Sequence, residues 1–223
     1  MKGALSLPGV KVDRNEFLLS AFAPYGDSVQ LIDSTPIKIY PKEVVNKIAN
    51  DVIKNHTNKV TLISAAAGIP GGLAMFGTVP ADLAQFFCNF LIMAQKLAYV
   101  YGWPDLRDEQ NGLGDGAQSV LTIFVGVAMG VNGANTLLRE VAETAARSMS
   151  KRIATQALTK TTWYPIIKKI GSYIGIKITK KMVGKGVAKA VPIIGAIVSG
   201  GLTYATFKPM ARKLKDELNH NSG

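Results

Sequence analysis

The sequence predicts an all-α protein, a single multi-helix domain whose apolar hairpins are broken by glycine and proline. Apolar residues make up 48% of the 223 residues and charged residues only 18%, below the roughly 25% of an ordinary soluble domain. Apolar residues recur at helical spacing, and long segments carry no charge. The chain is therefore expected to bury more than an average protein, or to contact lipid or a partner.

Residues 1–40 are predicted to form a capping arm that makes few contacts. Within it, Asp13 is placed to cap a short helix that includes Phe17 and Ala21 and that Pro24 and Gly26 end. The N-terminus lacks the long apolar run and the cleavage site of a secretory signal. We expect no signal peptide and a position on the cytoplasmic side of the membrane, peripheral or partly inserted. The single cysteine, Cys88, fits a reducing compartment and a buried thiol.

Residues 41–217 are predicted to form the helical domain, followed by a tail over 218–223. Its first helix begins at Pro41, where a missing N–H costs nothing, and carries Val45, Val52 and their neighbours on one apolar face. His56 is expected near the end of this helix or on the surface, because no histidine or carboxylate cluster accompanies it. The sequence predicts no metal site and no cofactor.

Two glycine-containing uncharged segments follow along the chain. Residues 60–81 are expected to form two short helices that meet at 68–72, where Gly71 and Gly72 let backbones approach closely. Residues 116–138 place Gly126 and Gly130 in GxxxG spacing, which marks close helix contact. Both segments are long enough to span a bilayer, yet their glycines favour broken hairpins that are either buried or inserted.

A long main helix is predicted from Pro80 to about Tyr101. Asp82 falls in its first turn, where a carboxylate is favoured, and Gly102 closes the helix in the left-handed conformation before Pro104. The helix is apolar over nearly its whole circumference. One narrow stripe is polar and is where the helix would meet water, a polar neighbour or a headgroup layer: Asp82, Gln85, Asn89 and Lys96.

Four stretches of this sequence resemble the bacterial EcsC protein family over about residues 45–217. They are GIPGG at 68–72, VPADLAQF at 79–86, LAYVYGWPDL at 97–106 and VPIIGAIVSGGLTYATFKPMARKLK at 191–215. The resemblance implies a helical, membrane-associated bacterial protein without an established reaction. Because the family is named for an operon that also encodes an export transporter, it also implies an export complex as a partner.

The net charge of +11 is placed unevenly. Residues 144–215 contain fifteen Lys or Arg and no Asp or Glu, whereas the rest of the chain has eleven basic and fifteen acidic residues. Such asymmetry indicates a basic face for phosphate in lipid or nucleic acid. No runs of stacking aromatic residues accompany the lysines, so we expect anionic membrane lipid and no nucleic acid. The alternative is a solvated basic surface.

The lipid-binding residues are predicted on a basic amphipathic helix that follows an interfacial aromatic anchor. Alternation of isoleucines at 174, 176 and 178 is the competing signal, for a strand. The anchor and the lysines of the basic face are Trp163, Lys177, Lys180, Lys181, Lys185 and Lys189.

Catalytic chemistry is mostly missing from the sequence, and no catalytic residue is predicted. Residues 112–115 read GLGD, which resembles the GxGD motif of intramembrane aspartyl proteases, whose mechanism needs two carboxylates. Asp115 would need Asp82 as its partner, and the setting of Asp82 does not match that family. A glycine loop with a helix-capping Asp115 explains the same letters.

These observations predict a membrane-associated, non-enzymatic protein that docks on anionic lipid through its basic C-terminal half. It would then insert an apolar hairpin or assist an export machine. The first alternative is a soluble all-helical interaction module whose apolar segments form a dry core. A remote alternative is a membrane hydrolase that uses Asp82 and Asp115. The oligomeric state is not indicated.

Overall fold

The computed structural model describes residues 10–68, 75–106, 115–147 and 200–222. Within these ranges, the side chains of residues 66–68, 75–84, 115, 145–147, 200 and 202 are not described. The described part is 80% helical, with seven α-helices and no strand, which confirms the predicted all-α class. In the same ranges, no helix combines the length and the hydropathy needed to cross a membrane.

Four short elements open the described chain: α2 (Arg14–Phe22), η1 (Ala23–Tyr25), η2 (Val29–Ile32) and α3 (Pro36–Ile39). The predicted cap of α2 is confirmed, because the Asp13 carboxylate accepts a hydrogen bond from the Glu16 N–H at 2.9 Å. The predicted end is confirmed as well, since α2 passes into the turn η1 at Pro24 and the chain leaves through Gly26 at φ +121°.

The expectation that this arm makes few contacts is wrong for its described residues. Val10, Leu18 and Phe22 are fully buried and belong to the main core. The Gln95 side chain fixes the arm's extended start, because it accepts from the Val12 N–H and donates to the Val10 carbonyl at 2.6 Å. A buried amide that meets a backbone in this way satisfies polar groups on both sides.

Arg14 clamps the arm to the rest of the protein. Its buried guanidinium donates to the carbonyls of Leu31, Ser34 and Trp103 at 3.0–3.3 Å. Burial lowers the pKa of Arg14, an effect that the negative charge of Asp105 opposes. One buried cation thus joins two turns of the arm to the end of the main helix.

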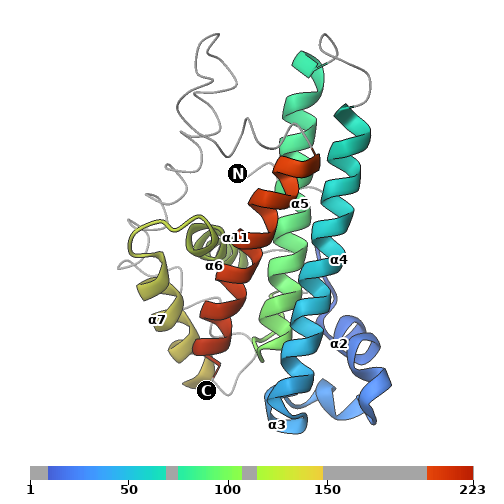
Figure 1. The fold of residues 1–223 in the computed structure, drawn as a ribbon. Coiled ribbons are helices and arrows are strands. Elements are labelled where there is room, and N and C mark those ends of the chain that lie inside the picture. Colours follow the sequence, from blue (N-terminus) through green and yellow to red (C-terminus); the bar gives the residue numbers. More distant parts are fainter. Residues whose placement is uncertain (1–9, 69–74, 107–114, 148–199, 223) are drawn as a thin grey trace.

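The helices α4 (Lys42–Gly68) and α5 (Met75–Val100) run antiparallel, side by side (Figure 1). The Pro41 carbonyl accepts the first helical N–H bonds of α4, from Val44 and Val45. The start predicted for the main helix is wrong, because α5 begins at Met75 and Pro80 lies inside it. A proline inside a helix lacks one backbone hydrogen bond, a loss that this helix tolerates near its N-terminus. Asp82 is therefore not a first-turn residue.

The end predicted for α5 is confirmed. Gly102 has φ +86°, and the N–H groups of Gly102 and Trp103 bond to the carbonyls of Tyr99 and Ala98 at 3.1 and 3.0 Å. This pair of bonds is the Schellman motif, which requires a left-handed residue that glycine adopts without strain. A Cβ at Gly102 would also lie 3.3 Å from the Thr35 side chain of the arm.

The second uncharged segment folds as two helices, α6 (Asp115–Ala128) and α7 (Ala134–Arg147). Gly130 has φ +70° and ends α6 with a second pair of capping bonds, made by the N–H groups of Gly130 and Val131. The interpretation of Gly126 and Gly130 as a helix-contact pair is therefore wrong. The chain turns at the second glycine, so the two never share one helical face.

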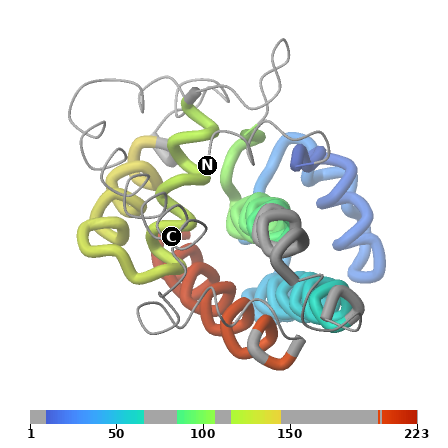
Figure 2. The backbone as a smooth tube through the Cα atoms, turned by 90° about the horizontal axis from the view of Figure 1, so that it is seen from above, coloured from blue at the N-terminus to red at the C-terminus, as the bar shows by residue number. Residues whose placement is uncertain are grey.

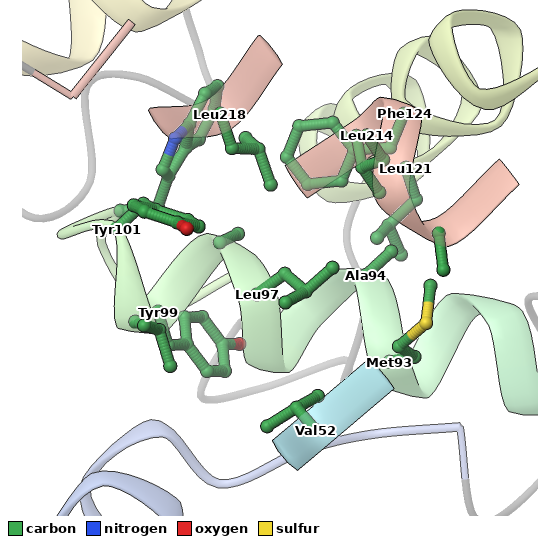
Figure 3. Close-up of a cluster of buried hydrophobic side chains, with 14 of the residues drawn as sticks. Val52, Met93, Ala94, Leu97, Tyr99, Tyr101, Leu121, Phe124, Leu214 and Leu218 are labelled. Atoms are coloured by element: carbon green, nitrogen blue, oxygen red, sulfur yellow. The ribbon is translucent and has the colours of Figure 1, made fainter. Parts of the chain in front are cut away.

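The last helix, α11 (Gly200–His220), packs on α4, α5 and α6. Figure 2 shows α5 near the centre of the bundle, and it contacts α2, α4, α6 and α11. The close-up in Figure 3 shows Leu97 of α5 among side chains of α6 and α11, including Phe124 and Leu214. Leu218 is also buried, so the core continues into the predicted tail.

Candidate functional site

An open groove of about 290 Å³ separates α4 from α11 along part of their contact. Three of the side chains that line it are cationic, and no carboxylate is among them. The lining residues are Asn50, Ile53, Lys54, Thr57 and Asn58 of α4 and Tyr204, Lys208 and Arg212 of α11. The lining of the groove therefore carries a positive charge.

Helical spacing places these side chains opposite one another. Asn50, Lys54 and Asn58 follow each other at four-residue intervals along α4 and so share one face. Tyr204, Lys208 and Arg212 do the same along α11. Since the two helices pack against each other, two polar stripes far apart in the sequence form the two walls of one groove.

The wall formed by α11 is held in place from behind. Phe207 is fully buried, and its ring packs edge-to-face on Phe86 at 5.3 Å and on Phe90 at 5.8 Å between centroids. Such aromatic pairs each contribute roughly 0.5–1.5 kcal/mol beyond their buried area. The packing of Phe207 on α5 therefore fixes where Lys208 and Arg212 lie.

Lys208 and Tyr204 form a pair on this wall. The lysine amine donates a hydrogen bond to the phenol oxygen and lies 4.7 Å from the ring centroid. This hydrogen bond, with the charges of Lys208 and Arg212, lowers the pKa of Tyr204. On the other wall, the Asn50 carbonyl oxygen accepts from Lys215 at 2.9 Å, which leaves its NH₂ group as the available donor.

Thr57 is the groove's one deeply buried polar side chain in the described part of the chain. It is 1% exposed, and its hydroxyl has no hydrogen-bond partner among the described residues. Buried hydroxyl groups nearly always have a partner in native proteins, so this one needs an explanation. The hydroxyl oxygen itself is covered by neighbouring atoms, so a ligand in the groove would reach it only once that cover moves aside.

The polar stripe predicted on α5 is buried only in part where it is described, since Gln85 and Lys96 are half-buried and Asn89 is buried. Asn89 is buried, its NH₂ bonds to the Gln85 carbonyl at 2.9 Å, and its side-chain oxygen has no described partner. Lys96 is half-buried, with its amine 5.4 Å from the centroid of the Phe17 ring. Burial, followed by the charge of Lys59, lowers the pKa of Lys96. The side chain of Asp82 lies outside the described residues.

The placement predicted for His56 is wrong. α4 continues for three turns beyond it to Gly68, and the imidazole is 8% exposed. Burial, with smaller effects from the charges of Lys96 and Lys59, lowers the pKa of His56 to about 4, so the ring is neutral at pH 7. The missed signal was the spacing, since Val52, His56 and Val60 recur every four residues on the apolar face.

The remaining predicted residues fall in different places. The Tyr101 hydroxyl donates to the Asn46 side chain at 2.9 Å, and burial raises its pKa. Cys88 is half-buried rather than buried, and partial burial raises its thiol pKa. In the described ranges, no three His, Cys, Asp or Glu side chains are grouped closely enough to hold a metal ion.

Several predicted residues cannot be placed in the fold. Asp115 is the first residue of α6, but its side chain, like that of Pro80, lies outside the described residues. The same holds for the whole of the predicted bend and lipid-binding set: Gly71, Gly72, Trp163, Lys177, Lys180, Lys181, Lys185 and Lys189.

The groove itself is absent from the sequence predictions. Four-residue spacing in the sequence indicates each polar stripe, on α4 and on α11. It does not indicate that the two stripes face each other. Against known proteins, the chain matches no family model, no curated protein and no solved structure.

Proposed function

We propose that this protein docks on anionic membrane lipid through its basic C-terminal half. The observation that carries the proposal is the groove, where Lys208 and Arg212 of α11 join Lys54 of α4 without a carboxylate among the lining residues. An anionic surface attracts each such lysine or arginine by about 1 kcal/mol. The fifteen basic residues between 144 and 215 extend the same attraction along the chain.

Exposed apolar side chains beside the groove support lipid over a purely aqueous partner. Leu62 is 69% exposed and lies one turn of α4 beyond Asn58 of the groove lining. Tyr204 is exposed on the opposite wall. Cations next to an exposed aliphatic and an exposed tyrosine suit the boundary between headgroups and acyl chains.

The resemblance to the EcsC family adds two elements to the proposal. It favours an export complex as a protein partner in the same membrane, and a bacterial cytoplasmic face as the place of docking. Insertion of an apolar hairpin would follow docking, because electrostatic attraction brings the protein to the surface before apolar burial can stabilise it there.

Sedimentation with lipid vesicles tests the proposal. We expect the protein to pellet with vesicles containing phosphatidylserine at low salt, to stay soluble with neutral phosphatidylcholine, and to be released by 0.5 M salt. Replacing Lys177, Lys181, Lys185 and Lys189 with Gln should remove about 4 kcal/mol of the free energy of binding to anionic vesicles. The affinity should then fall by about a thousandfold.

The matched control replaces Lys2, Lys11, Lys38 and Lys42 with Gln, which removes the same charge from the N-terminal part of the chain. This control should bind much more tightly than the Lys177–Lys189 variant. A protein that stays in the supernatant with anionic vesicles at low salt would rule out lipid docking.

A further inference from the structure

We infer that the groove between α4 and α11 is a specific site for a phosphate monoester. The inference rests on the proposed function for the source of the phosphate, a lipid headgroup, but its chemistry follows from the groove alone. The ligand would be held by Lys54 on one wall and by Lys208 and Arg212 on the other, above the hydroxyl of Thr57.

The positive charge of the groove favours an anionic ligand. Lys54, Lys208 and Arg212 come from two helices and line one volume of about 290 Å³ without a carboxylate in its lining. These three like charges repel one another. An anion bound between them is attracted to each cation, and this attraction offsets the repulsion. Arginine matches the oxygens of a phosphate in a bidentate fork, while lysines act as point charges.

The uncharged hydrogen-bond donors of the groove favour an anion that has several acceptor oxygens. The Thr57 hydroxyl has no partner among the described residues, and the Asn50 NH₂ remains available because its carbonyl oxygen is used by Lys215. Asn58 adds a second amide. Together with three cations, this donor set exceeds what the two oxygens of a carboxylate can accept. A phosphate monoester offers three terminal oxygens and nearly two negative charges at pH 7.

Size and surroundings favour a headgroup. A volume of about 290 Å³ lies at the lower limit of small-molecule sites, which suits a phosphate and a few further atoms. Tyr204 of the lining is exposed, and so is Leu62, one helical turn beyond Asn58 of the lining. The acyl part of a lipid would leave the groove along these two side chains. The preferred lipid is therefore one with a terminal phosphate, such as phosphatidic acid, over one with a phosphodiester.

Calorimetric titration with inorganic phosphate at pH 7.5 tests the chemistry without a membrane. The wild type should bind phosphate, and Lys208→Ala/Arg212→Ala should bind at least about tenfold more weakly, since each charged hydrogen bond is worth about 1.5–3 kcal/mol. The matched control Lys38→Ala/Lys42→Ala removes two exposed lysines outside the groove and should bind like wild type. Should the double variant fail to fold, exposed Lys54→Ala replaces it.

Thr57→Val separates a ligand role from a structural one. The hydroxyl makes no hydrogen bond in the described protein, so the variant should unfold at the same temperature as wild type or higher. It should nevertheless bind phosphate roughly tenfold more weakly. Equal phosphate affinity in wild type and in both groove variants would overturn the inference.

Vesicles then identify the source of the phosphate. At matched surface charge, wild type should prefer phosphatidic acid over phosphatidylserine about tenfold, and Thr57→Val should lose that preference but keep its binding to phosphatidylserine. Phosphate binding that the groove variants abolish, with no vesicle binding at all, would support the site for a soluble monoester and reject lipid docking. Vesicle binding without any phosphate affinity would support docking and overturn the site.

Discussion

Two consecutive residues of α4 meet two different environments. His56 lies on the side that packs on α5, where Lys96 and Lys59 are close enough to affect its pKa. Thr57 lies on the side that faces α11 and lines the groove. Each side chain has a buried polar atom, the histidine Nδ1 and the threonine hydroxyl oxygen, without a hydrogen-bond partner among the described residues.

The difference between the two sides lies in what can relieve this cost. An unsatisfied buried polar group costs about 1–3 kcal/mol. On the α5 side, His56 is enclosed among apolar residues and two cations, so it limits the cost by remaining neutral. On the α11 side, Thr57 borders an open volume that a ligand can enter. The unpartnered histidine in the core therefore makes the stability of the fold depend on pH. The unpartnered threonine lies beside a volume in which a ligand has room to bind.

Phe207→Ala should cause the largest loss of stability, because it removes the ring that packs α11 on α5 behind the groove. This ring joins α11 to Phe86 and Phe90 of α5, so its loss leaves a cavity behind the wall of the groove. We expect the free energy of unfolding to fall by about 3–5 kcal/mol in urea titrations followed by circular dichroism. The control Tyr204→Ala changes an exposed ring on the same helix and should cost far less. A loss below about 1 kcal/mol for Phe207→Ala would contradict this packing.

Acid should weaken the α5 side through His56. The folded pKa is about 4 and the ordinary value is 6.5, so between these values the unfolded chain binds a proton that the folded chain does not. The free energy of unfolding is therefore unaffected by His56 above pH 6.5. It falls as the pH drops toward 4, by up to about 1.4 kcal/mol per pH unit and about 3 kcal/mol in all.

His56→Leu isolates this contribution from that of the carboxylates. Leucine fits an apolar surrounding and cannot take up a proton, so the variant should be at least as stable as wild type at pH 7 and should lose less stability at pH 5. Urea unfolding of both proteins at pH 7, 6 and 5 provides the measurement. Parallel pH curves would show that His56 is not the titrating group.

Local signals in the sequence predicted the ends of helices well. Asp13 caps α2, and Gly102 ends α5, because the side chain or the conformational freedom of one residue decides the local backbone. Pro80 misled for the same reason. Its local preference for a first turn was outweighed by a helix that begins at Met75.

Features that depend on distant contacts could not be predicted. His56 required knowing that α4 continues to Gly68 and packs on α5, and burial of the arm required the contacts of Arg14 and Gln95. The groove is the extreme case, since Lys54 and Lys208 are separated by most of the chain. Periodicity places each residue on a face, but only the packing of α11 on α4 determines which faces meet.

Tyr101→Phe should cause the smallest loss of stability, and it tests whether the two sides of α4 are independent. The phenol joins the end of α5 to Asn46 near the start of α4, outside the groove lining, through a 2.9 Å hydrogen bond. Because Asn46 is only half-buried, water can replace the lost partner, and the free energy of unfolding should fall by about 0.5–1 kcal/mol. Phosphate affinity should stay at the wild-type level. A stable variant with weakened phosphate binding would mean that the groove depends on the whole α4–α5 hairpin, and that the two sides of α4 are not independent.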